Sequence, residues 1–328
     1  MTALRTRQPT GAIAYPMILV EGAEKAGKTY AALSLSKDER IGRAFLFDFG
    51  EGSGDEYAPI GDYEIVEHDG TFTDFIGQLE AACAVPSDDG KPNLIVIDSV
   101  SGLWDALKVW AENRARRSRR GRELLAKDPD AEIDVPMNLW TDTNERWGRM
   151  VGVLRGWPGV AVLIARGREV AKVGAGGAPV AGQTEYRVEA QKSLPFSVTA
   201  QVRMSAPHRA TLVAARSLTI DMPPQGLVLP DEAPLASLIF DKLGAGGTWA
   251  VPDIGKTNFG RTVAGAKNEL VDLFTKAGQT AEAAKAIAAE VWKAGPCADA
   301  GRDDEVSDEA WASLVAAASV RLSDLEAK

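Results

Sequence analysis

Short apolar runs alternate with segments of helical periodicity along the first two thirds of the chain. The apolar runs over 15–22, 43–50, 93–100 and 159–166 are short and mainly continuous, as expected for strands buried on both faces. A further strand, more polar, is predicted over 63–68. Between them, apolar residues recur at helical spacing over 28–39, 71–84 and 146–157. Strands that alternate with helices predict an α/β fold with a mainly parallel central sheet and helices on both faces.

The pattern changes in the last third of the chain. Segments 196–205 and 209–217 alternate apolar and polar residues, which predicts an antiparallel hairpin that extends the sheet. Loop-forming prolines and glycines follow, around one short helix at 235–243. Three further helices are predicted over 265–278, 280–295 and 307–328. We therefore expect a sheet domain over 1–245, a linker over 246–257 and a small helical domain over 258–328.

Composition limits the class of protein. The chain has 328 residues, of which 45% are hydrophobic and 25% charged, as in ordinary globular proteins. No apolar run approaches the roughly 18–20 residues of a membrane span, and no secretion signal is evident, so no membrane partner is expected. Cys83 and Cys297 are the only cysteines, which favours a reducing compartment, the cytoplasm. His68 and His208 lack the neighbours of a metal site.

Charge is distributed unevenly. The formal net charge is −9, which argues against a protein that coats nucleic acid over its whole surface. However, residues 108–122 contain seven basic residues and one acid, whereas residues 297–328 contain eight acids and three bases. Any contact with a polyanion is therefore expected from a local basic surface.

Residues 22–29, GAEKAGKT, fit the phosphate-binding pattern G-x-x-x-x-G-K-[ST] between a predicted strand and a predicted helix. Backbone N–H groups and the helix N-terminus bind phosphate in such a loop, and Lys28 reaches the terminal phosphates. Lys25 either reaches a phosphate or faces solvent. We assign ATP binding to this loop and the residue after it: Gly22, Ala23, Glu24, Lys25, Ala26, Gly27, Lys28, Thr29 and Tyr30.

Magnesium and the attacking water require further side chains. Thr29 follows the phosphate-binding lysine, and Asp98 ends the strongest predicted strand, so these two are assigned to Mg²⁺. Ser99 rather than a glutamate follows Asp98, so the base must come from another strand. We choose Glu51, with Asp48 as the second choice, to orient water toward the γ-phosphate. Alternatively, both acids accept hydrogen bonds from backbone N–H groups in a turn.

These motifs resemble those of the RecA-like ATPases, in order and direction, over about 200 residues. GAEKAGKT resembles the family's phosphate loop, FLFDFGE the strand that ends in its catalytic glutamate, LIVIDSVSGL its second nucleotide motif, and VAVLIARGREV the strand before its mobile DNA-binding loop. The late hairpin most resembles phage-encoded members that act in single-strand annealing and recombination. One departure is that Ala165 and Arg166 stand where the family's sensor strand ends in a polar amide.

The resemblance implies a RecA-like ATPase core over 1–245 and two loops that bind single-stranded DNA. The first corresponds to 108–136 and the second, a flexible glycine-rich segment, to 169–187. In both, a solvated surface is the alternative. The candidate DNA contacts are Arg114, Arg116, Arg117, Arg119, Arg120, Lys172 and Arg187.

The family also implies a homo-oligomer, as a ring or a filament. In such an assembly a basic residue reaches the neighbouring protomer's γ-phosphate, and Arg187 and Lys192 are candidates by position. A single-strand-binding protein or another recombination factor is a further expected partner. The predicted function is a DNA-stimulated, Mg²⁺-dependent ATPase of phage-type recombination or annealing. The alternatives are a P-loop kinase or other NTPase that does not act on DNA, and an ATP-bound scaffold with little turnover.

Overall fold

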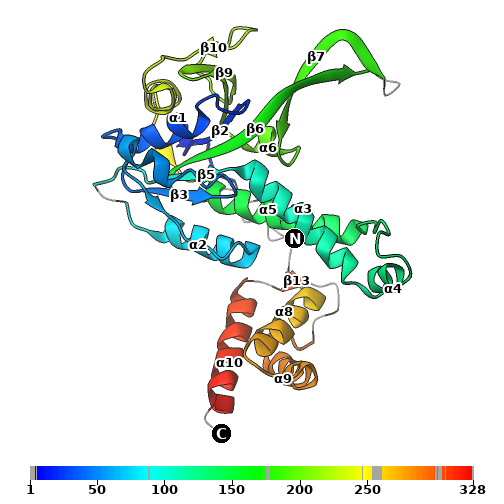
Figure 1. Ribbon diagram of the computed structural model, residues 1–328. Helices are drawn as coiled ribbons and strands as arrows, with labels where there is room; N and C mark the ends of the chain where they lie inside the picture. Colours follow the sequence, from blue (N-terminus) through cyan, green and yellow to red (C-terminus); the bar gives the residue numbers. More distant parts are fainter. Residues whose placement is uncertain are drawn as a thin grey trace. The chain divides into compact units, whose positions relative to one another are not determined.

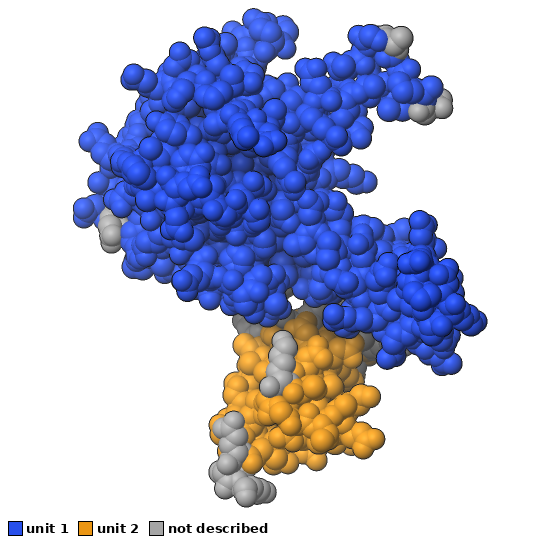
Figure 2. Space-filling model, viewed as in Figure 1, with its two compact units in different colours: residues 1–252 blue, residues 253–328 orange. Residues whose placement is uncertain are grey.

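A computed structural model describes residues 4, 6–87, 89–174, 178–245, 247–252, 261–299, 301, 305–306 and 308–326. The chain forms two compact units, residues 1–252 and 253–328 (Figure 2). The division falls inside the stretch 246–257 to which the sequence assigns the linker.

Unit 1 is an α/β domain built around one large sheet (Figure 1). Its strands are β1 (Ile13–Ala14), β2 (Met17–Gly22), β3 (Ala44–Asp48), β4 (Glu64–Ile65), β5 (Leu94–Asp98), β6 (Val160–Val173), β7 (Pro179–Glu189), β8 (Ala200–Ala206), β9 (Arg209–Ala215), β10 (Leu227–Val228) and β11 (Trp249–Ala250). Its helices are α1 (Lys28–Ser34), η1 (Leu35–Lys37), η2 (Asp55–Ile60), α2 (Phe72–Ala84), α3 (Val100–Arg116), α4 (Arg119–Lys127), α5 (Met137–Arg155), α6 (Leu194–Ser197), α7 (Pro234–Ala236) and the π-helical η3 (Ser237–Leu243).

The large sheet has the strand order β10-β9-β8-β2-β6-β5-β3-β4, and β7 pairs with β6 beside this path. The pairs from β8 through β2, β6, β5 and β3 to β4 are parallel, whereas β8 and β9 form the predicted antiparallel hairpin. The predicted fold class is confirmed. The strand that carries Asp98 is separated from the strand before the phosphate loop by β6 alone.

The sheet divides the core into two layers, as the two-residue period of a strand requires. Along β2, Ile18 and Val20 pack in the layer that holds α1, α7 and η3. Met17 and Leu19 pack in the opposite layer, with α2, α3 and α5. Figure 1 shows these helices covering the two faces. β2 is buried along its whole length between β8 and β6, and Gly22 lies at its carboxyl end.

Two segments expected to be loops are regular structure. The segment 169–187 was expected to be a flexible loop, but its described part is a long hairpin in which β6 and β7 pair antiparallel from Arg166↔Glu189 to Val173↔Pro179. Residues 175–177 lie outside the described residues. The basic segment 108–136 belongs largely to α3 and α4, which extend away from the sheet (Figure 1). In both segments the composition suggested a loop. The side chains nevertheless keep the two-residue period of a strand or the spacing of a helix.

Unit 2 contains three helices among its described residues: α8 (Val263–Lys276), α9 (Ala281–Ala294) and α10 (Asp308–Glu326). They enclose a core that includes Leu270, Phe274, Trp292 and Leu314. Two short strands not expected from the sequence, β12 (Arg261–Thr262) and β13 (Glu305–Val306), pair antiparallel. Ser307, at which the last predicted helix begins, lies outside the described residues.

Across the described ranges of both units, the structure contains no helix with the length and apolar character needed to cross a membrane.

Candidate functional site

The phosphate loop connects β2 to α1. Gly27 has φ +84° and Lys25 has φ +58°, so the loop curls back on itself before the helix begins at Lys28. At Gly22 a Cβ atom would lie 2.4 Å from the backbone oxygen of Met204 on β8, so only glycine fits there. The two pattern glycines therefore meet different needs: Gly22 permits close packing of two strands, and Gly27 permits a left-handed turn.

Lys28 lies across the hollow of this loop. Its Nζ donates hydrogen bonds to the carbonyl oxygens of Gly22, at 3.1 Å, and Ala23, at 2.7 Å. Burial lowers the pKa of Lys28, against the charges of Asp98, Glu51 and Glu24, which raise it. A partly desolvated ammonium held by neutral carbonyls gains from an anionic partner, and a phosphate is such a partner.

Thr29 and Asp98 meet at the carboxyl ends of β2 and β5. The Thr29 hydroxyl donates to Asp98 Oδ2 at 2.6 Å, and Asp98 is 3% exposed. Burial raises the pKa of Asp98 to about 6, and the nearby charges of Glu51 and Asp48 raise it as well. Hydroxyl and carboxylate oxygens in a surplus of negative charge are suitable ligands for a hard divalent cation such as Mg²⁺. The residues present therefore fit the expected metal.

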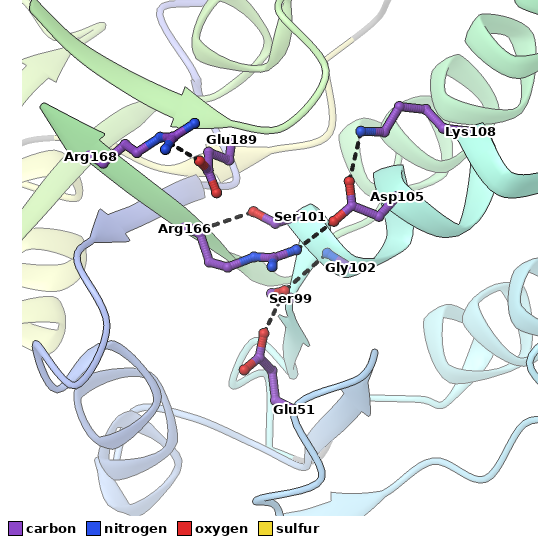
Figure 3. A network of polar contacts seen from close by, with 9 residues as sticks. All are labelled: Glu51, Ser99, Ser101, Gly102, Asp105, Lys108, Arg166, Arg168 and Glu189. Atoms are coloured by element: carbon purple, nitrogen blue, oxygen red, sulfur yellow. Dashed lines mark hydrogen bonds and ion pairs between the residues drawn. The ribbon is translucent and has the colours of Figure 1, made fainter. Parts of the chain in front are cut away.

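Glu51 and Asp48 differ in what occupies their carboxylates. Asp48 Oδ1 accepts hydrogen bonds from the backbone N–H groups of Glu51 and Gly52, each at 3.0 Å, so it shapes the turn after β3. Glu51 is exposed, and its Oε1 accepts a hydrogen bond from the Ser99 hydroxyl at 3.0 Å (Figure 3). The capping alternative thus describes Asp48, whereas the Glu51 carboxylate faces the site and has capacity to accept a proton from water.

A cavity of about 610 Å³ opens beside the phosphate loop. Its walls come from α1, from the turn between β8 and β9, and from the start of α7. Tyr30 lies on one side and contacts the His208 ring edge-on, with a centroid separation of 5.2 Å. The cavity lies next to the phosphate site, its surface is mainly apolar, and its volume is within the range of small-molecule pockets.

Sequence reasoning missed two features of this site. Ser99 was noted only because it is not a glutamate, yet it holds Glu51 in place and also accepts a hydrogen bond from the Gly102 N–H at 3.1 Å. The cavity walls at Pro207 and at Asp231–Ala236 carry no motif, and they reach α1 only through the fold. No local pattern marks them.

The candidate DNA residues lie on two projections of unit 1, away from the phosphate loop (Figure 1). The arginines at positions 114, 116, 117, 119 and 120 are exposed, on the end of α3 and on α4, and Arg119 pairs with Glu123 at 2.9 Å. On the hairpin, Lys172 is exposed, and Arg187 pairs with Glu185 at 2.9 Å. Lys192 is exposed after β7.

Tyr186 is not a free stacking platform. It lies half-buried beneath the guanidinium of Arg203, which is 3.8 Å from the centre of its ring. One face of the ring is therefore already covered and is closed to a nucleic-acid base.

These features define a P-loop nucleotide site at the carboxyl edge of a parallel sheet. Residues 14–204, more than half of the chain, match the family described as AAA domain. The chain belongs to this family, whose domain is of the ATPase type that binds and hydrolyses nucleoside triphosphates.

The comparison with curated proteins found no match. Among solved structures, the chain is similar to a RadB recombinase, with 18% identity and a TM-score of 0.37, over 67% of this chain and 87% of that one. It is also similar to an ATPase from the type III secretion system of pathogenic bacteria, with 12% identity and a TM-score of 0.30, over 94% and 82% of the respective chains. Both likenesses are weak, so neither is used to assign a function.

Proposed function

We propose that the protein is a Mg²⁺-dependent ATPase that binds single-stranded DNA and acts in phage-type recombination or annealing. The observation that carries the ATPase part is the convergence of Lys28, Thr29, Asp98 and Glu51 at one edge of the sheet. The DNA part is supported by the exposed basic surface of α3 and α4, by the exposed Lys172 and Arg187 of the hairpin, and by the resemblance of the motifs to RecA-like ATPases.

In this proposal the nucleotide base enters the cavity beside Tyr30, and the phosphates lie in the loop. Lys28 exchanges the carbonyls of Gly22 and Ala23 for oxygens of the β- and γ-phosphates. Thr29 and Asp98 hold Mg²⁺, which when bound offsets the negative charge that develops on the phosphates. Glu51, fixed by Ser99, orients the attacking water.

The proposed DNA contacts are electrostatic. Exposed arginines on α3 and α4 neutralise phosphates without regard to base sequence, and Lys172 and Arg187 add contacts along the hairpin. The active form is a homo-oligomer, a ring or a filament, in which Arg187 or Lys192 of one protomer acts at the neighbour's γ-phosphate. A single-strand-binding protein or another recombination factor is its proposed partner.

The test is the rate of ATP turnover with and without a single-stranded oligonucleotide, for the parent and for Lys28→Ala. We expect stimulation by DNA in the parent and loss of turnover in the variant, because the substitution removes the charge that meets the phosphates. Turnover that needs a small-molecule acceptor and ignores DNA would indicate a kinase. Nucleotide binding without turnover would indicate a scaffold. Unchanged hydrolysis in Lys28→Ala would end the P-loop assignment.

A further inference from the structure

Arg166 stands on β6 directly beside the start of the phosphate loop. In the parallel pairing of β6 with β2 it is the register partner of Gly22. Two residues earlier, Ile164 is the partner of Asp98 on β5. The strand that lies between the phosphate-loop strand and the metal-site strand therefore places a cation at their shared edge.

The backbone of Arg166 is fixed, whereas its side chain is not. Its N–H donates to the Ser101 hydroxyl at 2.9 Å, which ties the residue to the first turn of α3 (Figure 3). The preceding residue, Ala165, is completely buried. The Arg166 side chain is 46% exposed, so the guanidinium can reorient without disturbing the core.

The present partner of Arg166 is suited to releasing it. Arg166 Nη2 donates to Asp105 Oδ2 at 2.6 Å, and Asp105 Oδ1 is paired at 2.8 Å with Lys108 (Figure 3). Because Asp105 keeps Lys108, it does not lose its only cation when Arg166 leaves. An ion pair between side chains this exposed is weak, so a more negative partner can displace it.

Arg166 also lies within electrostatic reach of the phosphate-binding amine. Arg166 is the register partner of Gly22, and Lys28 Nζ donates to the carbonyl oxygen of the same Gly22 at 3.1 Å. Lys28 and Arg166 repel each other at the carboxyl ends of the strands, and both are stabilised when a triphosphate binds between them. A guanidinium binds phosphate oxygens in a bidentate manner, which an ammonium does not.

We infer that Arg166 contacts the γ-phosphate of ATP within its own chain and leaves Asp105 to do so. This inference rests on the proposed ATP site and adds a residue that distinguishes ATP from ADP. The difference between ATP and ADP would also reach the β6–β7 hairpin, because Arg166 is the first residue of β6 that pairs with β7. Movement of its side chain occurs at the root of the β6–β7 hairpin.

The experiment measures affinity for ADP and for ATPγS, each with Mg²⁺ and without DNA, in the full chain. Arg166→Met removes the charge and keeps most of the volume. We expect it to weaken ATPγS binding by about tenfold or more, the size of one charge-assisted hydrogen bond, and to leave ADP binding unchanged. Arg166→Lys keeps the charge and is expected to restore part of the loss.

The matched control is Arg168→Ala. Arg168 lies two residues along the same strand, on the same face, and pairs with Glu189 at 2.8 Å (Figure 3). It is expected to keep the parent's ratio of ADP to ATPγS affinity. Asp105→Asn frees Arg166 and is expected to raise ATPγS affinity by up to about fivefold, the worth of an exposed ion pair.

An Arg166→Met protein with the parent's affinity ratio, or with both nucleotides weakened equally, overturns the inference. So does an Arg168→Ala protein with the same loss of ATPγS affinity, because the effect would then belong to the hairpin in general. Failure of the parent itself to bind either nucleotide would instead refute the proposed ATP site, so the two ideas fail separately.

Discussion

Asp98 provides the sharpest test of the metal site. The free energy that its ionisation costs the protein without nucleotide or metal can be calculated from the structure. At 3% exposure its carboxylate is almost fully removed from water, and burial raises its pKa from 3.8 to about 6. At about 1.4 kcal/mol per pKa unit, ionising Asp98 in the folded protein at pH 8 costs about 3 kcal/mol more than in the unfolded chain. Replacement by asparagine removes that cost.

The sign with pH follows from proton binding. Between pH 3.8 and about 6 the folded protein holds a proton on Asp98 that the unfolded chain has lost, so stability falls as pH rises through this window. Above it the penalty is complete, and below it the penalty vanishes. Asp98→Asn is therefore expected to be more stable than the parent by up to about 3 kcal/mol at pH 8 and by nothing near pH 3.8. Its amide oxygen can still accept the Thr29 hydroxyl hydrogen bond.

The assay is urea denaturation across this pH range in a chelator without nucleotide, followed by thermal denaturation with Mg²⁺ and ATPγS. In the second condition the order reverses, because the parent gains stability from ligand that the variant no longer binds well. Asp105→Asn is the control for the denaturation without nucleotide. Although partial burial raises the pKa of Asp105, its hydrogen bonds and charges with Lys108 and Arg166 lower it overall, so no gain is expected at pH 8. A difference between Asp98→Asn and the parent that is independent of pH would refute the reasoning.

Two further predictions concern turnover and DNA. Glu51→Gln is expected to slow ATP hydrolysis by about 10²-fold or more while ATP affinity stays close to that of the parent, because a water-orienting carboxylate acts on the chemical step; hydrolysis at the parent rate would move the base elsewhere, with Asp48 next. Alanine at Arg116, Arg117, Arg119 and Arg120 is expected to flatten the slope of log affinity for a labelled oligonucleotide against log salt by up to roughly 3 units. Arg149→Ala, on α5 and paired with Glu80 at 2.8 Å, is the matched control, and an unchanged slope in the fourfold variant would direct the search to 172–192.

The central sheet could be predicted from the sequence because its strands are buried on both faces. A strand such as Leu94–Asp98 must then be continuously apolar, and it ends where a polar side chain reaches the edge. The phosphate loop could be predicted for a related reason: its glycines are required by local geometry, at Gly22 by the approach of Met204. Burial of a strand on both faces and a close backbone contact each restrict which residues fit, so both can be recognised in the sequence.

The long hairpin could not be predicted, because glycine and alanine between 174 and 182 suggest a loop while the pairing of β6 with β7 is decided by contacts along the whole ladder. The cavity could not be predicted for a different reason. Its walls include Tyr30, His208 and Pro234, which only the fold brings together. Arg166 was visible in the sequence, but only as a departure from a family pattern, because its meaning depends on its register with Gly22.

Both strands of the hairpin are attached to residues beside the phosphate loop. On the β6 side Arg166 is the partner of Gly22, and on the β7 side Tyr186 packs beneath Arg203. Arg203 in turn donates to the Oε1 atom of Glu21 at 2.9 Å, and Glu21 is completely buried immediately before Gly22.

Within this second attachment, the pair between Arg203 and Glu21 is the part that is costly to lose. Burial raises the pKa of Glu21 even though the charge and hydrogen bond of Arg203 lower it, so the loss of Arg203 would leave a buried carboxyl group without its cation. On the β6 side, by contrast, the Arg166–Asp105 pair is exposed, and breaking it leaves no buried charge. Because the backbone of Arg166 is held by Ser101 while its side chain is exposed, exchange of its partner would change the charges at the root of the hairpin and not the pairing of its strands. In the proposed function, this places an exchangeable charge between the nucleotide site and the hairpin that carries Lys172 and Arg187.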